Sequence, residues 1–394
     1  MKMGIQVKML ASLERAREEM AKIGADPAGI EIMLPKALFH AIKITGVSSA
    51  GANILKQEIL SKGGEAVVAK QVVSGGIAYS DVLLLATQRQ YQLLVEKIKK
   101  QPFGLREIAV RLEEVLEALN EKQVKGLDCR GKFLPLGKKT LIMGIINLTP
   151  DSFSDGGSYK DPEDVIRRAK EMEAEGADII DLGAESTRPG AEKISSQEEK
   201  ARLFPVLSRI SKEVNIPLSL DTYKAEIAEM GLDLGVHIIN DIWGLQGDPR
   251  MAEVAARYQC PVIVMHNQEG TGYKDLLTDI NNFFEKSIGI AEKAGLNRSQ
   301  LILDPGIGFG KTMEHNLEIL NRLGEFKGLG CPILVGTSRK SFIGKVLDLP
   351  VNEREEGTAA TVALAIAGGA DIVRVHNVKM MSRVAKMADA IVRR

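Results

Sequence analysis

Residues 141–147 read Leu-Ile-Met-Gly-Ile-Ile-Asn, an apolar run that ends in an amide side chain. Seven more short runs of apolar and β-branched residues follow, and stretches with helical periodicity separate most of them. Near-continuous apolar strands that alternate with amphipathic helices indicate a parallel sheet covered on both faces. The eight runs are 141–147, 178–183, 217–221, 237–241, 262–266, 301–304, 333–337 and 371–376.

Eight strand–helix units in about 250 residues predict a TIM (β/α)8 barrel over residues 126–394. A doubly wound open sheet is the alternative, because eight strands also fit that layout. The short run 132–136 is expected to close the bottom of the barrel.

The first 125 residues show a different pattern of short strand-like and helical stretches, which predicts a small separate α/β domain. A polar stretch over 120–126 has the composition of a linker. The pattern shows no catalytic spacing and indicates no role for this domain. Its expected helices are 10–23, 50–61, 91–99 and 105–119, and its expected strands are 39–47, 65–73 and 81–86.

The composition excludes several classes of protein. Lys+Arg and Asp+Glu are 52 each, so the chain lacks the basic excess of a nucleic-acid binder. No apolar stretch is long enough to span a membrane, and the acidic N-terminal region does not resemble a targeting signal. Cys129, Cys260 and Cys331 are far apart and form no CxxC pair, so we expect buried thiols and a cytoplasmic protein.

The predicted strands end in polar side chains, and the C-terminal ends of barrel strands meet at one rim. Two carboxylates and an amide (Asp221, Asp304, Asn240) suit a flat heterocycle that carries N–H donors. Cations suit phosphate or diphosphate oxygens. We therefore expect a substrate that is heterocyclic at one end and anionic at the other. The rim residues are Asn147, Asp181, Glu185, Asp221, Asn240, Asp241, His266, Asp304, Ser338, Arg339, Lys340, Arg374 and His376.

Two loops after the first two strands, 147–157 and 185–190, are rich in glycine, proline and small hydroxyl side chains. That composition is typical of loops that close over a site and exclude water. Residues 304–312 look superficially like a phosphate-binding loop. Pro305 stands where that motif needs glycine, so they are better described as a small-residue strand exit with Lys311 nearby.

These motifs resemble those of the dihydropteroate synthases. The segments 145–157 and 181–190 are similar to the two signatures of that family, and the matching motifs around Asp221, Asn240, Asp304, Lys340 and Arg374 follow in the family's order. The resemblance covers the barrel and excludes the N-terminal domain. It implies a transferase of folate biosynthesis that condenses 4-aminobenzoate with 6-hydroxymethyl-7,8-dihydropterin diphosphate, giving 7,8-dihydropteroate and diphosphate.

The resemblance also implies residue roles, with Mg²⁺ as the cofactor. Asp221, Asn240, Asp304 and Lys340 would hold the pterin. Asn147, Arg374 and His376 would serve the diphosphate, with Asn147 as the metal ligand, and Val375 is a further expected substrate-binding residue. Thr187, Pro189 and Ser338 would line the aminobenzoate pocket, and Asp151 and Arg188 would close over it. Asp151, Arg188 and Lys340 form the expected catalytic set. The protein is expected to be a homodimer and a sulfonamide target. Asn267 departs from the family pattern, where many members have methionine.

Two alternative functions use the same barrel. A pterin-dependent methyltransferase acting on a corrinoid protein would share the carboxylate and amide set, but it would not need residues 338–340 or 187–190. A non-catalytic pterin-binding protein would not need intact rim motifs. A turnover assay that measures diphosphate release separates the synthase from both alternatives.

Overall fold

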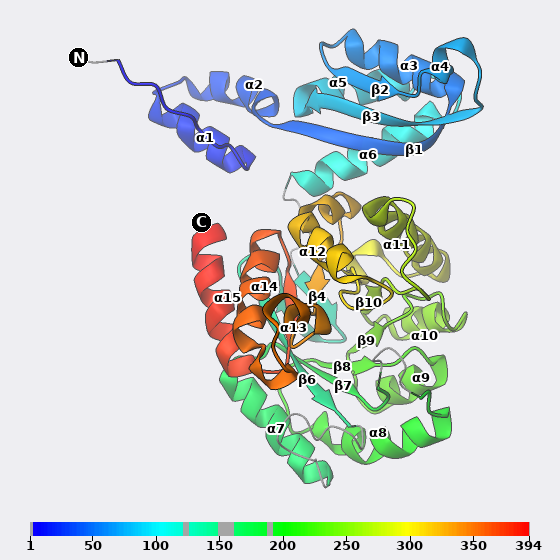
Figure 1. Cartoon of the computed structure of the whole chain (residues 1–394), viewed down its shortest axis with the longest axis vertical. Helices are drawn as coiled ribbons and strands as arrows, with labels where there is room; N and C mark the ends of the chain where they lie inside the picture. Colours follow the sequence, from blue (N-terminus) through cyan, green and yellow to red (C-terminus); the bar gives the residue numbers. More distant parts are fainter. Residues whose placement is uncertain (1–2, 121–125, 149–160, 187–191, 394) are drawn as a thin grey trace. The chain divides into compact units, whose positions relative to one another are not determined.

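The computed structural model describes residues 3–120, 126–148, 161–186 and 192–393. The chain divides into two compact units, Met1–Lys122 and Gln123–Arg394, whose elements are labelled in Figure 1. Each unit has its own buried hydrophobic core. No helix within the described ranges is long and apolar enough to cross a membrane.

The larger unit contains eight parallel strands in one sheet. The strand order is β11-β10-β9-β8-β7-β6-β13-β12, and a bridge between Leu303 and Ile333 joins β11 to the residues that lead into β12. The sheet therefore closes on itself, which confirms the predicted barrel and excludes the open sheet. The strands are β6 (Leu141–Asn147), β7 (Ile179–Gly183), β8 (Leu218–Asp221), β9 (Ile238–Asp241), β10 (Val262–Met265), β11 (Leu301–Asp304), β12 (Leu334–Val335) and β13 (Ile372–Val375).

The barrel interior is arranged in layers. One apolar cluster takes residues from the starts of seven strands, among them Ile179, Ile238, Ile302 and Ile372. Side chains alternate across a strand with a period of two, so the residue two positions later faces the same side. That rule places Asp181, Asn240, Asp304 and Arg374 in the next interior layer, above the apolar floor. The intervening residues belong to the outer core between strands and helices.

A two-stranded hairpin completes the apolar floor. It consists of β4 (Gly126–Cys129) and β5 (Lys132–Pro135), and its Leu127 and Leu134 pack in the same cluster as the strand starts. Lys132 Nζ donates to the carbonyl oxygens of Val214 and Ile216, at 3.2 and 3.0 Å. The hairpin thus closes the N-terminal end of the barrel, as expected for residues 132–136, and leaves the opposite end for chemistry.

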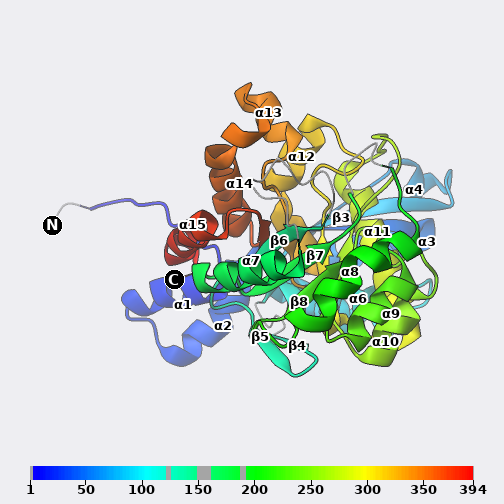
Figure 2. The ribbon, with the colours of Figure 1, turned by 90° about the horizontal axis from the view of Figure 1, so that it is seen from below.

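Nine helices of the described chain follow the barrel strands, and neighbours such as α7 and α8 or α8 and α9 pack against each other. Figure 2 shows them around the strands. Short polar caps such as Ser195 and Asp275 accept from the first-turn amides and begin α8 and α11. The helices are α7 (Pro162–Glu175), α8 (Ser196–Ile210), α9 (Ala225–Asp233), α10 (Met251–Tyr258), α11 (Leu276–Ala294), α12 (Met313–Asn321), α13 (Ser341–Leu347), α14 (Glu355–Ala367) and α15 (Val378–Val392).

The smaller unit is an antiparallel three-stranded sheet of order β1-β3-β2 with helices. Its core includes Leu55, Leu84, Leu94 and Leu112, so it is the small α/β unit that the sequence predicts. The elements are α1 (Leu13–Lys22), α2 (Pro27–Ala37), β1 (Phe39–Ser48), α3 (Ser49–Leu60), β2 (Glu65–Val68), α4 (Gln71–Ser74), β3 (Tyr79–Thr87), α5 (Gln88–Ile98) and α6 (Leu105–Leu119).

The structure corrects two expectations for the smaller unit. The strand predicted over 65–73 ends at Val68, and Gln71–Ser74 forms the short helix α4, which Gly75 ends in a left-handed conformation (φ 70°). Helix α2 was not predicted at all. Its signal is Asp26, whose carboxylate accepts from the amides of Ala28 and Gly29, followed by Pro27 in the first turn.

Candidate active site

A buried polar network lies in the barrel interior, directly above the apolar floor. Asn240 Nδ2 donates to Asp181 Oδ2 at 3.1 Å. Arg374 Nε donates to the same oxygen at 2.7 Å, and Arg374 Nη2 donates to Asp221 Oδ2 at 2.9 Å. The carboxylates of Asp181 and Asp221 are 0% and 8% exposed. The structure therefore brings Asp181, Asp221, Asn240 and Arg374 together, as the strand ends predict, and it shows that Asp181, which had no expected role, contacts both Asn240 and Arg374.

Arg374 has a more specific position than the sequence indicates. We expected it to face the anionic part of the substrate, but in the structure it bridges two carboxylates from β7 and β8. Burial raises the pKa of Asp221, and the nearby Arg374 guanidinium opposes that rise. The single positive charge of Arg374 thus offsets part of the negative charge of Asp181 and Asp221.

Asp304 and Lys340 carry opposite charges that influence each other electrostatically at the same end of the barrel. Asp304 Oδ1 accepts from the Gly306 amide at 2.8 Å, and Lys340 Nζ donates to the Ile307 carbonyl and lies 4.7 Å from the centroid of the Phe309 ring. Burial lowers the pKa of Lys340 to about 8, and Asp304 opposes that shift. Burial likewise raises the pKa of Asp304, opposed mainly by Lys340.

The segment after β11 is held by a second lysine. Lys311 Nζ contacts His266 Nδ1 at 2.8 Å and donates to the Phe309 carbonyl at 2.9 Å, and burial lowers its pKa to about 7. Gly306 has a φ of +66°, and a Cβ atom there would collide with the His266 carbonyl oxygen. Gly306 therefore serves a tight turn against His266, the residue that follows β10.

The upper rim contains Ser338, His376 and Asn147. Ser338 is buried, and its Oγ lies 2.9 Å from His376 Nδ1 and accepts from the His376 amide at 3.2 Å. Asn147 is the last residue of β6. It lies four positions after Met143 of the interior cluster, so the period of two directs it inward.

Val375 needs a correction. It was expected among the substrate-binding residues, between Arg374 and His376. Its side chain is 0% exposed and belongs to the hydrophobic core between the strands and the helices. The period of two explains this placement, because Arg374 faces inward and the next side chain on β13 therefore faces outward.

Four predicted residues, Asp151, Thr187, Arg188 and Pro189, lie outside the described residues. Glu185, a predicted rim residue, belongs to a charged cluster with Lys224 and Glu199, which the sequence did not indicate. Lys224 Nζ pairs with Glu185 at 2.6 Å and with Glu199 at 2.7 Å, and Tyr223 donates to Glu185 at 2.9 Å. These contacts fix Glu185 at the rim of the barrel.

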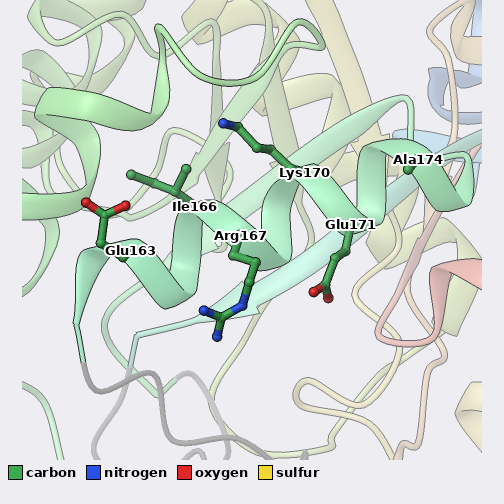
Figure 3. A pocket seen from close by; sticks show the side chains of 6 residues that line it. All are labelled: Glu163, Ile166, Arg167, Lys170, Glu171 and Ala174. Atoms are coloured by element: carbon green, nitrogen blue, oxygen red, sulfur yellow. The ribbon is translucent and has the colours of Figure 1, made fainter.

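A separate hollow of about 470 Å³ lies on helix α7, and Figure 3 shows its lining side chains. Lys170 in this hollow pairs with Glu213 at 2.6 Å, and Arg167 pairs with Asp164 at 2.5 Å. The hollow contains none of the predicted site residues, so we place the site in the barrel interior.

The fold and the buried polar layer define the class of protein, an enzyme that binds a pterin in a (β/α)8 barrel. Residues 143–376 match the family model described as pterin binding enzyme. The dihydropteroate synthase of Bacillus subtilis is 52% identical over 269 residues, which cover 68% of this chain and 94% of that relative. A crystal structure of the Clostridium difficile dihydropteroate synthase, in the presence of pteroic acid, has a TM-score of 0.64 and 53% identity, covering 66% of this chain and 99% of that one.

The chain therefore belongs to the pterin-binding enzyme family. Its activity is that of a dihydropteroate synthase, a transferase of folate biosynthesis, and the methyltransferase and non-catalytic alternatives are not favoured.

One further relative includes the N-terminal unit. A probable bifunctional folylpolyglutamate synthase/dihydropteroate synthase of Halobacterium salinarum is 41% identical over 386 residues, which cover 96% of this chain and 46% of that relative. The smaller unit and the barrel thus occur together in another protein.

Proposed function

We propose that the buried polar layer of the barrel binds the pterin diphosphate and that 4-aminobenzoate attacks its methylene carbon from the rim. The observation that carries this proposal is the network of Asp181, Asn240, Arg374 and Asp221. It places carboxylates, an amide and a guanidinium in one dry interior, where hydrogen bonds to charged groups are strong.

The pterin half of the site consists of Asp221, Asn240, Asp304 and Lys340. A pterin ring carries an N–C–NH2 edge, which a carboxylate recognises with two parallel hydrogen bonds. Asp304 is 7% exposed and Asn240 is 4% exposed, so few water molecules compete for these groups. The apolar floor below them limits how deep the ring enters.

The anionic half consists of Arg374, His376 and Asn147. As the C–O bond to diphosphate breaks, negative charge grows on the leaving oxygens, and positioned cations and N–H donors stabilise it. The amine nitrogen of aminobenzoate forms the new C–N bond and then loses a proton. No side chain has to act as a covalent nucleophile. Thr187, Pro189 and Ser338 are proposed to line the aminobenzoate pocket, and Asp151 and Arg188 to close it.

Mg²⁺ fits this half as an ion that arrives with the diphosphate. In the part of the chain that the structure describes, no group of three His, Cys, Asp or Glu side chains is arranged to hold a metal. Mg²⁺ commonly takes one or two protein oxygens and completes its shell with water and phosphates. Asn147 would hold the ion through its amide oxygen, and bound Mg²⁺ would neutralise charge on the leaving group.

The organisation of the protein is also part of the proposal. Residues 126–394 form the catalytic domain, and residues 1–125 form a separate domain without an assigned role. The protein works as a homodimer in the cytoplasm, binds neither nucleic acid nor membrane, and is a target of sulfonamides. The three cysteines, which are buried and unpaired, support a reducing compartment.

Calorimetry with the full-length protein tests the assignment of the pterin half. Asn240→Ala should weaken the binding of 6-hydroxymethylpterin by at least about tenfold, because a buried hydrogen-bond partner is lost. Binding of Mg²⁺-diphosphate should change by less than about threefold, since Asn240 lies in the pterin half. Unchanged pterin affinity in a folded variant would remove Asn240 from the site.

A further inference from the structure

Asp181 is the most enclosed charged residue of the interior layer. It lies on β7 between the apolar Ile179 and Gly183, and it is 0% exposed. A buried carboxylate is expensive unless it is paired and hydrogen-bonded. Neither half of the proposed site includes it, so its place in the barrel needs a separate explanation.

One oxygen of Asp181 serves both halves of the site. Arg374 reaches Oδ2 with Nε at 2.7 Å and with Nη2 at 2.6 Å, and Asn240 Nδ2 reaches the same atom at 3.1 Å. Two guanidinium nitrogens on one oxygen fix the direction of the Arg374 side chain. The other oxygen, Oδ1, has no hydrogen-bond partner among the described residues.

Asp221 does not duplicate this role. It contacts Arg374 through Nη2 alone, at 2.9 Å, and within the described residues no hydrogen bond joins it to Asn240. Asp181 is therefore the point where the pterin-facing amide and the anion-facing guanidinium meet.

We propose that Asp181 is a positioning residue that orients Asn240 for the pterin and Arg374 for the diphosphate at the same time. This inference rests on the proposed function of those two residues. Asp181 would act through them and would not touch the reacting atoms. Loss of the Asp181 charge would therefore weaken the binding of both the pterin and the diphosphate, although Asp181 contacts neither ligand.

Binding measurements on the full-length protein separate this role from a merely structural one. Asp181→Asn keeps the size of the side chain and removes its charge. It should lower the binding affinity for 6-hydroxymethylpterin and for Mg²⁺-diphosphate by at least about tenfold each. The matched control is Asp178→Asn, because Asp178 precedes the same strand at the opposite end and bonds the Ile142 amide at 3.0 Å. The control should leave both affinities within about twofold.

The failure of this inference is distinct from failure of the proposed function. Asn240→Ala should weaken only the binding of the pterin. His376→Ala should weaken only the binding of Mg²⁺-diphosphate, because the bonds of His376 are to Ser338 and not to the pterin-binding carboxylates. If those two variants show this selectivity while Asp181→Asn weakens the binding of only one ligand or of neither, the positioning role is wrong. If the two variants show no such selectivity, the residue roles under the proposed function are wrong.

A measurement on the unchanged protein covers the case in which Asp181→Asn does not fold. The Arg374 Nε–H group bonded to Asp181 should give an arginine side-chain NMR signal that exchanges slowly with solvent, assigned by its loss in Arg374→Lys. We expect slow exchange in the free protein and with either ligand bound. Fast exchange on binding Mg²⁺-diphosphate would show that Asp181 releases Arg374 in the complex, and it would overturn the proposal.

Discussion

Lys340 shows how burial sets the chemistry of a single residue. It lies over the Phe309 ring, and burial lowers its pKa to about 8, a shift that the charge of Asp304 opposes. A lysine with a lowered pKa is a cation below that pH and becomes neutral above it. The positive charge proposed to hold the pterin is therefore lost in the free enzyme within an accessible pH range.

We predict that kcat/KM falls as the pH rises through about 8, since kcat/KM reports the free enzyme. Lys340→Arg supplies the control, because arginine stays charged throughout this range. That variant should turn over more slowly but lack the alkaline fall. A wild-type profile that stays flat to pH 9 would show that the charge of Lys340 is not needed.

Strand ends made much of the site predictable at the residue scale. Asp221, Asn240 and Asp304 each end a short apolar run, so their place at one rim follows from the sequence. The contact between Arg374 and Asp181 does not follow from the sequence, because the two residues are far apart in the chain and meet only when the barrel closes. Val375 was misplaced because the motif around Arg374 was carried over without regard to which way each side chain faces.

At the scale of elements, the hairpin β4–β5 is the structural base of the site. Leu127 is 1% exposed and packs against strand starts, so it supports the floor beneath the polar layer. Phe133 on the same hairpin is 64% exposed. The two side chains are close together in the sequence, but Leu127 is buried and Phe133 is exposed.

Leu127→Ala should lower the free energy of unfolding by about 2–5 kcal/mol, because the deletion leaves a cavity in the floor. Phe133→Ala, the exposed control, should change it by less than about 0.5 kcal/mol. Urea denaturation followed by far-ultraviolet circular dichroism measures both. Equal effects of the two substitutions would mean that the hairpin is not packed into the barrel as described.

The eight barrel strands were predictable as elements because each is an apolar run that is buried on both faces. Residues 65–73 misled for a local reason. The run contains two pairs of β-branched valines, Val67-Val68 and Val72-Val73, which favour a strand. Gly75 and Gly76 nevertheless end a helical turn there. Helix α2 was missed because Pro35 lies inside it, and proline ordinarily disfavours a helix interior.

At the scale of the whole molecule, the barrel carries every proposed site residue and has its own core. The Bacillus subtilis relative matches 68% of this chain with 94% of its own length, so the corresponding enzyme there has little besides the barrel. These observations favour a catalytic unit that does not need residues 1–122.

We predict that a chain beginning at Gln123 folds and keeps kcat and the KM for 4-aminobenzoate within about threefold of the full-length values, since few contacts usually cross such a boundary. The start must precede Gly126, because a later start removes part of β4 and exposes the floor. Steady-state kinetics and light scattering provide the test. A folded truncated protein with a strongly raised KM, or an aggregating one, would instead assign the smaller unit a role in closure or assembly.

The most direct test of the central claim is the turnover of Asp304→Asn, measured as diphosphate released and dihydropteroate formed. The wild-type protein should release one diphosphate for each dihydropteroate. The variant should be at least about a hundredfold slower at an unchanged melting temperature, since a positioned charge in a dry site typically contributes about 2.7 kcal/mol or more. Near-normal turnover by a well-folded Asp304→Asn protein would contradict the claim that the buried polar layer of the barrel is where the reaction takes place.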